Sequence, residues 1–333
     1  MKTYFPIVNV LKLILAVFVV ASHVRAIVPD ESFSATINFI WPLAVPFFFI
    51  ASGYFLSTKL LRQTSSTECY NILVCRSKQV ARMWGIWMLI YLPLSLLFFF
   101  ESDIPLPRFI YQYLFSAFLF GESHFAWMLW FIYSMAISLY IIALIAYKFK
   151  RSILLILFIF PVLIHCFLPY LDVANREWLI LQIMSRLFSG GGYLLIGYFI
   201  ARTISTTVLF EPRFHCRMNV VIIGLLAMVL GVGMYAMEIP LFRVFGGGGA
   251  VLLGLSYQQQ FRPGRLVKSF GNISAWIYFL HLYVVRFADA YFVQSYNINQ
   301  VFLITAGISV LLSVVVYVLQ QTRYFKWLSF LVS

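Results

Sequence analysis

Residues 5–28 read FPIVNVLKLILAVFVVASHVRAIV, an almost uninterrupted apolar run with Lys12 inside it. A hydrocarbon core about 30 Å thick is crossed by roughly 20 mostly apolar helical residues. The run follows a basic start but lacks a small-x-small cleavage site, which favours a retained first span over a removed signal peptide. Similar runs recur along the chain, and their repetition decides the fold class.

The whole chain has the composition of a polytopic membrane protein. Of its 333 residues, 62% are hydrophobic, 19% are aromatic and only 11% are charged, and the mean hydropathy is +0.92. A water-soluble fold of this size could not bury so much apolar surface. These values exclude soluble enzymes and nucleic-acid readers. The four Cys residues have no metal-type spacing, so they indicate neither a disulfide framework nor a zinc site.

Ten segments are long and apolar enough to span a bilayer. They cover about 5–28, 36–58, 80–100, 125–147, 152–170, 178–203, 218–237, 241–258, 271–294 and 299–322. Helices are expected because lipid offers no partners for backbone N–H and C=O groups. The stretch 108–120 is apolar but too short to span, which predicts a partly buried or interfacial helix. We therefore predict an all-α membrane bundle of about ten transmembrane helices, forming one domain over residues 1–333 with both termini cytoplasmic.

The charges of the connecting segments support this topology. The chain has 24 Lys+Arg against 11 Asp+Glu. With the N-terminus inside, the cytoplasmic segments hold 17 basic and two acidic residues, whereas the opposite segments hold four basic and nine acidic residues. Lys and Arg accumulate on the cytoplasmic side of membrane proteins. The net charge of +13 is therefore mostly a topology signal, and no nucleic-acid partner is needed.

Three basic residues, Lys12, Arg186 and Arg286, fall inside predicted spans. A charge there costs about 2.5 to 3.5 kcal/mol on insertion scales, so Lys12 and Arg186 are candidates for function. Arg286 lies three residues before Asp289, and an ion pair within one helical turn would explain it.

Lys12 and His23 lie on one face of the first predicted helix. Eleven steps of about 100° come to three turns plus about 20°, and the rise separates the two residues by roughly 16 Å. A cation near the cytoplasm and an imidazole nearer the outer side would suit an elongated anionic cofactor. The alternative is a Lys that extends its ammonium to the interface and a His at headgroup level.

Three motifs resemble the acyltransferase-3 family of membrane proteins. The first is a basic residue, Lys12, separated from His23 by ten residues; the family usually has Arg at the basic position. The second is Val45-Pro46-Phe47-Phe48-Phe49-Ile50-Ala51-Ser52-Gly53-Tyr54 in the second span. The third is the Gly271-x-x-Ser274-x-x-x-Tyr278-x-x-His281 pattern. The size and number of spans also match, so the resemblance covers essentially the whole chain.

This resemblance implies transfer of an acyl group, usually acetyl from acetyl-CoA, to a hydroxyl of a carbohydrate or lipid-linked glycan. The reaction would occur at the outer face of the bacterial inner membrane. A neutral imidazole is well suited to take the proton of the attacking hydroxyl, so we expect His23 to be the general base. By the resemblance, Lys12 neutralises phosphate or orients the pantetheine arm, although Lys cannot grip a phosphate bidentately as Arg does. No metal is expected.

A basic run of Arg76, Lys78 and Arg82 leads into the third predicted span. In the family a paired basic motif at this point is thought to meet the nucleotide end of CoA, and clustered cations favour phosphate. Lys78 and Arg82 share a helix face, and Arg82 is expected at the entrance of the helix. Anchoring by the positive-inside rule is the equal alternative.

Ser52, His281 and Arg186 are the candidate substrate-binding residues. Ser52 beside Gly53 suits close helix packing next to His23 better than a nucleophile, and a structural hydrogen bond is the alternative for His281. The glycine runs 190–192 and 246–249 lack a phosphate-loop frame and also indicate helix packing.

Two other functions are considered. A transporter or flippase could line a pathway with Lys12, Arg186 and His281, but the sequence has no convincing inverted repeat. An inactive family-like sensor or scaffold is the third reading. The short connections leave no room for the soluble esterase-type domain of some family members.

Overall fold

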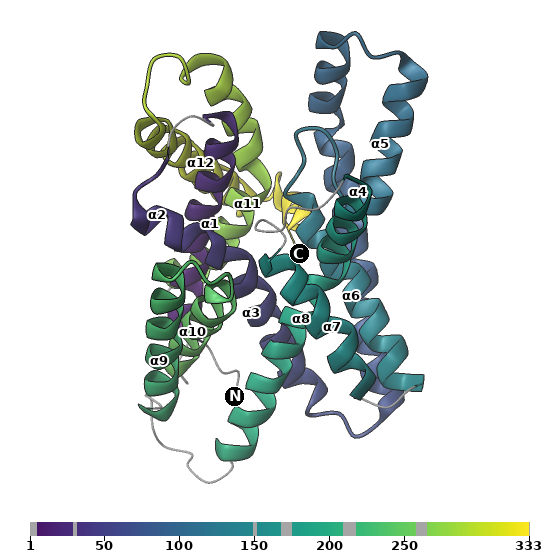
Figure 1. Ribbon diagram of the computed structural model, residues 1–333, viewed down its shortest axis with the longest axis vertical. Coiled ribbons are helices and arrows are strands. Elements are labelled where there is room, and N and C mark those ends of the chain that lie inside the picture. Colours follow the sequence, from purple (N-terminus) through teal and green to yellow (C-terminus); the bar gives the residue numbers. More distant parts are fainter. Residues whose placement is uncertain are drawn as a thin grey trace. The chain divides into compact units, whose positions relative to one another are not determined.

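A computed structural model describes residues 5–28, 32–148, 152–167, 175–208, 218–257 and 265–332. Within these ranges the chain forms helices joined by short connections, and no extended strand is present (Figure 1). The predicted all-α class is confirmed. The helices are α1 (Pro6–Ile27), α2 (Ala35–Ile40), η1 (Trp41–Leu43), α3 (Ala44–Leu60), α4 (Ser66–Glu101), α5 (Leu106–Phe120), α6 (Leu129–Lys148), α7 (Ser152–Phe167), α8 (Asn175–Val208), α9 (Met218–Ala236), α10 (Phe242–Ser256), α11 (Arg265–Tyr291), α12 (Ile298–Gln320) and η3 (Lys326–Leu331).

Seven of the helical runs in the described residues are long and apolar enough to cross a membrane. They lie in α1, the continuous run Ala35–Leu60, α4, α6, α8, α9 and α12. Helices α7, with 16 residues, and α10, with 15, are shorter than a typical crossing. A helix is present at each of the ten predicted spans, and the chain is a multi-pass membrane bundle. The number of crossings and the side of the termini stay predictions.

Helix α4 differs from the sequence expectation because it begins at Ser66, well before the predicted span at about residue 80. The connection after α3 is therefore short, and Arg82 lies in the middle of a 36-residue helix instead of at its entrance. No Gly or Pro interrupts residues 66–79, and Leu73 and Ser77 are buried on one face. Burial of this face stabilises the helical conformation through the basic region.

The chain divides into two compact units, Met1–Phe48 with Glu211–Ser333, and Phe49–Phe210. The first unit contains α1, α2 and α9–α12. Its helices α9 and α10 pack closely, because a Cβ added at Gly249 would lie 2.9 Å from the Gly224 carbonyl oxygen, and one at Gly231 would lie 3.0 Å from the Gly246 nitrogen. The predicted role of the 246–249 glycines in helix packing is confirmed.

The second unit contains most of α3 and the helices α4–α8. Short hydroxyl side chains join α4 to its neighbours: Ser77 Oγ donates to the Ala136 carbonyl at 2.7 Å, and Ser95 Oγ donates to the His124 carbonyl at 2.9 Å. Such bonds are worth about 0.6 to 2 kcal/mol each in membrane bundles. The predicted short helix at 108–120 is present as α5, which packs Phe109 against Phe99 of α4 with ring centroids 4.8 Å apart.

Candidate active site

Two imidazole rings meet inside the first unit. The ring centroids of His23, on α1, and His281, on α11, lie 4.9 Å apart with their planes at 40°. His281 is fully buried and His23 is half-buried. These are the histidines of the first and third sequence motifs, which the fold brings together from opposite ends of the chain.

The pair forms because α1 and α11 run parallel and closely packed. Asn9 Nδ2 donates to the Val267 carbonyl at 3.3 Å, and a Cβ added at Gly271 would lie 3.2 Å from Asn9 Oδ1. His23 lies 14 residues beyond Asn9, and His281 lies 14 residues beyond Val267. Equal steps along two parallel helices, each about 1.5 Å per residue, therefore bring the rings side by side. We call this interface the α1–α11 seam.

Lys12 and His23 lie on the packed side of α1. Counting about 100° per residue, they lie about 140 to 180° from the exposed Ile7 and Ile14, which are 36% and 44% accessible. The buried Leu15 and Ala16 flank them on the same side. The two polar side chains therefore share one side of α1, as the sequence predicted, and that side points into the protein and away from the exposed face.

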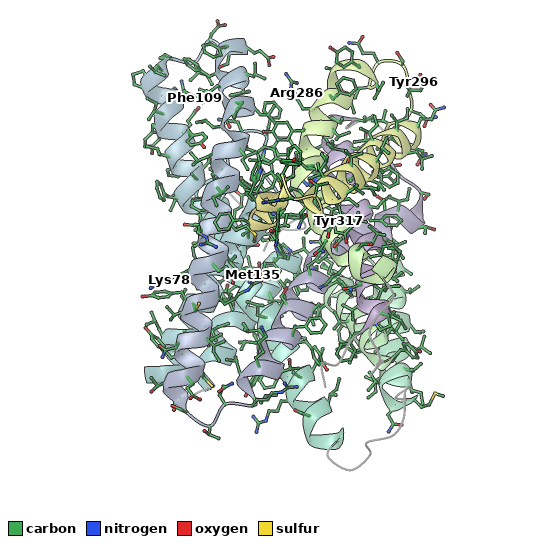
Figure 2. All side chains as sticks on the ribbon, turned by 180° about the vertical axis from the view of Figure 1, so that it is seen from behind. Lys78, Phe109, Met135, Arg286, Tyr296 and Tyr317 are labelled. Atoms are coloured by element: carbon green, nitrogen blue, oxygen red, sulfur yellow. The ribbon has the colours of Figure 1, made fainter. Side chains whose placement is uncertain are left out.

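The three predicted CoA-binding cations lie on the outer surface of α4. Arg76, Lys78 and Arg82 are all exposed, and Arg76 Nη1 donates to Gln79 Oε1 at 2.6 Å. Figure 2 shows Lys78 extending outward from the helix. The buried residues Leu73, Ser77 and Val80 lie on one side of α4, and Lys78 and Arg82 lie roughly opposite to it. A role in CoA binding stays a prediction for all three.

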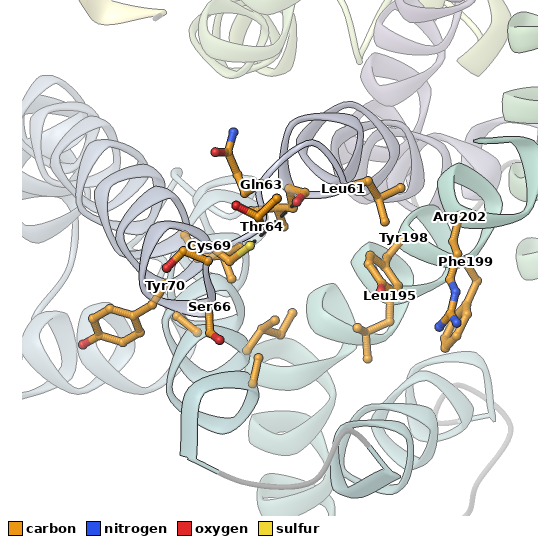
Figure 3. Close-up of a pocket in the computed structure, with 16 residues that line it drawn as sticks. Leu61, Gln63, Thr64, Ser66, Cys69, Tyr70, Leu195, Tyr198, Phe199 and Arg202 are labelled. Carbon is orange, nitrogen blue, oxygen red and sulfur yellow. Dashed lines mark hydrogen bonds between the residues drawn. The ribbon is translucent and has the colours of Figure 1, made fainter. Parts of the chain in front are cut away.

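A cavity of about 730 Å³ opens in the second unit where α3, α4, α6 and α8 end or begin (Figure 3). Its wall combines apolar residues such as Leu195 with the polar Gln63, Thr64 and Tyr198, and Arg202 contributes a cation. In the predicted topology these helix ends face the cytoplasm. Sequence reasoning counted Arg202 only as a topology signal, and no local motif could have revealed the cavity, because its wall comes from four separate segments.

Arg186 is paired within the second unit. Its guanidinium forms an ion pair with Glu122 and lies over the ring of Phe120, with Cζ 5.7 Å from the centroid. Burial raises the pKa of Glu122, and Arg186 lowers it in part. This pairing gives Arg186 a structural role, and its predicted contact with substrate is untested.

The predicted Arg286–Asp289 ion pair is confirmed, with Nη1 and Oδ2 2.9 Å apart.

Ser52 is half-buried on α3, and Gly53 beside it marks a very close helix crossing. A Cβ added at Gly53 would lie 2.2 Å from the carbonyl oxygen of Leu194 on α8. The prediction that this Ser-Gly pair permits close helix packing is therefore confirmed. The expectations that Ser52 lies beside His23 and binds substrate stay predictions.

Comparison with known proteins supports the assignment that the motifs suggested. The model of the acyltransferase-3 family, described as an acyltransferase domain, matches residues 5–318, so the chain belongs to this family. An amino-acid racemase from Enterococcus faecalis is 31% identical over 162 residues, which cover 46% of this chain and 20% of the racemase. The chain thus matches a minor part of that relative, and the racemase name does not inform its activity. No solved structure matches.

Family membership supports a membrane acyltransferase.

Proposed function

We propose that the protein is an O-acyltransferase that moves a short acyl group, usually acetyl, from acyl-CoA to a hydroxyl of a carbohydrate or lipid-linked glycan. The donor enters from the cytoplasm, and the acceptor is modified at the outer face of the bacterial inner membrane. The observation that carries this proposal is the contact of His23 with His281 in the α1–α11 seam. A membrane helix interface rarely contains two imidazoles without a functional reason.

The proposed reaction uses His23 as a general acid and base. The acceptor oxygen attacks the thioester carbonyl carbon while His23 takes the hydroxyl proton. The tetrahedral intermediate then collapses, the C–S bond breaks, and the CoA sulfur leaves with the proton that His23 returns. The products are the acyl ester and free CoA thiol, and His23 is neutral again.

Lys12 is proposed to bind the phosphate-bearing arm of the donor. It lies on the same side of α1 as His23 and roughly 16 Å away along the helix axis. An ammonium at that distance from the base suits a long anionic donor whose reactive thioester reaches His23. The half-buried position of Lys12 on the packed side of α1 supports this role, because solvent would weaken an exposed charge.

The cavity of the second unit has a lining that by itself suits a phosphate-bearing molecule. Its volume of about 730 Å³ lies within the usual range of small-molecule sites. Arg202, the α4 N-cap Ser65 and the first α4 residue Ser66 lie in its wall. Arg side chains and helix N-termini both favour anions such as phosphate. The outward-facing Arg76, Lys78 and Arg82 would add a positive potential that attracts the donor.

The test is transfer of label from acetyl-CoA by the purified protein, combined with glycan mass analysis of cells with and without the gene. We expect release of CoA thiol that requires the protein and acetyl groups on a surface glycan that disappear with the gene. Accumulation of substrate in vesicles without acyl-CoA would support a transporter instead. Unchanged glycan masses together with no CoA release would refute the proposal.

A further inference from the structure

His281 is held in one tautomer by its own helix. Its Nδ1 lies 3.0 Å from the carbonyl oxygen of Ile277, one turn earlier on α11. A carbonyl oxygen can only accept a hydrogen bond, so Nδ1 must carry the hydrogen. In the neutral ring the lone pair is then on Nε2, which can accept a hydrogen bond.

This Nε2 atom is buried and has no hydrogen-bond partner among the described residues. An unsatisfied buried polar atom costs about 1 to 3 kcal/mol, and most buried polar atoms in native proteins are satisfied. Two rings that can supply a donor contact His281: Tyr278, with centroids 6.3 Å apart, and His23, which is nearer at 4.9 Å. His23 becomes a donor at both ring nitrogens whenever it takes a proton.

We propose that His281 is a positioning residue for acyl transfer, whose Nε2 accepts a hydrogen bond from protonated His23. The proposal rests on the function proposed above. When His23 takes the acceptor's hydroxyl proton, the new imidazolium donates one N–H to His281 Nε2. The proton of the hydroxyl stays on the other nitrogen of His23 until the CoA sulfur takes it. His281 neither gains nor loses a proton in the cycle.

A neutral partner suits this location. In soluble hydrolases a carboxylate orients the catalytic His and stabilises its protonated form. A buried carboxylate inside a membrane bundle carries a large desolvation cost. An imidazole fixed by a backbone carbonyl provides the acceptor without adding a charge. The Asn9–Val267 hydrogen bond holds α1 and α11 in the register that this arrangement needs.

Two substitutions separate this role from a purely structural one. Asn at position 281 places an amide N–H where Nδ1 lies, so it can keep the bond to Ile277 but offers no acceptor at the Nε2 position. Gln reaches the Nε2 position and can present its carbonyl oxygen there, but it loses the Nδ1 donor. If His281 only stabilises its own helix, His281→Asn should be the mild change. If Nε2 serves His23, His281→Gln should be the mild change.

The experiment measures kcat and KM for acetyl-CoA with both variants, after size-exclusion chromatography and thermal melting in detergent show that they fold. We expect His281→Asn to lower kcat at least tenfold with KM unchanged, and His281→Gln to stay within about threefold of the wild type. In a His23→Ala background, His281→Asn should cause no further loss, because the two residues act as a unit. His165→Asn, in the second unit, is the matched control and should keep wild-type kcat.

The proposal is overturned if His281→Asn keeps the wild-type kcat, or if both folded variants lose activity equally. Should the Asn variant fail to fold, the Gln variant decides alone: folded and active supports the role, folded and inactive refutes it. An inactive wild type would refute the proposed acyl transfer itself, and an active wild type with a fully active Asn variant would refute only the role of His281.

Discussion

Two partly buried polar side chains, Arg186 and His165, have partners in the α6–α8 region of the second unit, whereas the α1–α11 seam of the first unit holds a buried acceptor that lacks a hydrogen-bond partner among the described residues. In the second unit Arg186 pairs with Glu122, and His165 Nδ1 lies 3.1 Å from Ser185 Oγ. In the seam, His281 Nε2 is buried without a partner among the described residues and lies beside a second imidazole. Polar groups that satisfy one another stabilise helix packing, whereas an open acceptor is available for chemistry. The contrast separates two histidines that look alike in the sequence, His165 and His281.

The largest expected effect is at His23. Replacing it with Ala should lower acyl transfer by at least about 100-fold, because general base catalysis contributes about 10²- to 10⁴-fold. The measurement is CoA release and acetyl transfer by purified protein, with membrane insertion checked by detergent extraction. His165→Asn should retain activity within a few fold. If the two substitutions have equal effects on transfer, the distinction between the two regions is wrong.

The next effect concerns the ion pair of the second unit. Arg186→Met should lower the free energy of unfolding by about 2 to 3 kcal/mol, because it leaves Glu122 partly buried and unpaired. The value is below that of a fully buried pair, since the two side chains are 25% and 16% exposed. Melting in detergent measures it, and adding Glu122→Gln should restore most of the loss. Unchanged melting of Arg186→Met would show that the pair does not stabilise the fold. An inactive but stable double variant would instead favour the predicted contact of Arg186 with substrate.

A smaller effect is expected at Gly53, where the backbones of α3 and α8 lie in close contact in the second unit. Gly53→Ala should destabilise it by about 1 to 3 kcal/mol, since the added Cβ meets the backbone of Leu194 and overpacking costs this much. Gly85→Ala is the control, because a Cβ there has nothing within 4 Å. Melting temperatures of the two variants test the difference. If Gly85→Ala is as harmful as Gly53→Ala, close packing is not the reason for the glycine.

The smallest effect is a pH dependence of stability at His124, in the connection between α5 and α6. Its ring stacks on Phe98 with centroids 4.3 Å apart, and burial lowers its pKa from 6.5. Below about pH 6.5 the unfolded chain therefore binds more protons at this residue than the folded chain does, so stability should fall as the pH falls. Melting in detergent from pH 8 to pH 5, compared with His124→Gln, measures this contribution. The Gln variant should show a shallower decline on the acid side, and an identical decline would contradict the assignment.

Local patterns of the sequence predicted what lies within one helix. The side shared by Lys12 and His23 follows from the helical repeat, and the Arg286–Asp289 pair follows from i,i+3 spacing. The close packing at Gly53 follows from a small residue in an apolar span. In the first two cases the interacting residues lie on the same helix, and in the third the packing requires only that the residue be small.

The early start of α4 was missed for a different reason. The basic residues Arg76, Lys78 and Arg82 suggest a connection between spans, although the helix continues through them with Leu73, Ser77 and Val80 buried on one side. The periodicity of Leu73, Ser77 and Val80 was the signal that could have revealed it. A charge run ends a membrane span without necessarily ending the helix.

Composition, hydropathy and motif spacing determined by themselves that this is an all-α membrane protein of the acyltransferase-3 type, because these properties depend on neighbours along one chain segment. Only the tertiary structure decided which distant groups meet: His281 against His23, Glu122 against Arg186, and the four segments around the cavity with Arg202. Contacts between such distant segments depend on helix register and crossing. Many arrangements of equally apolar helices satisfy the same sequence pattern, and packing selects one of them.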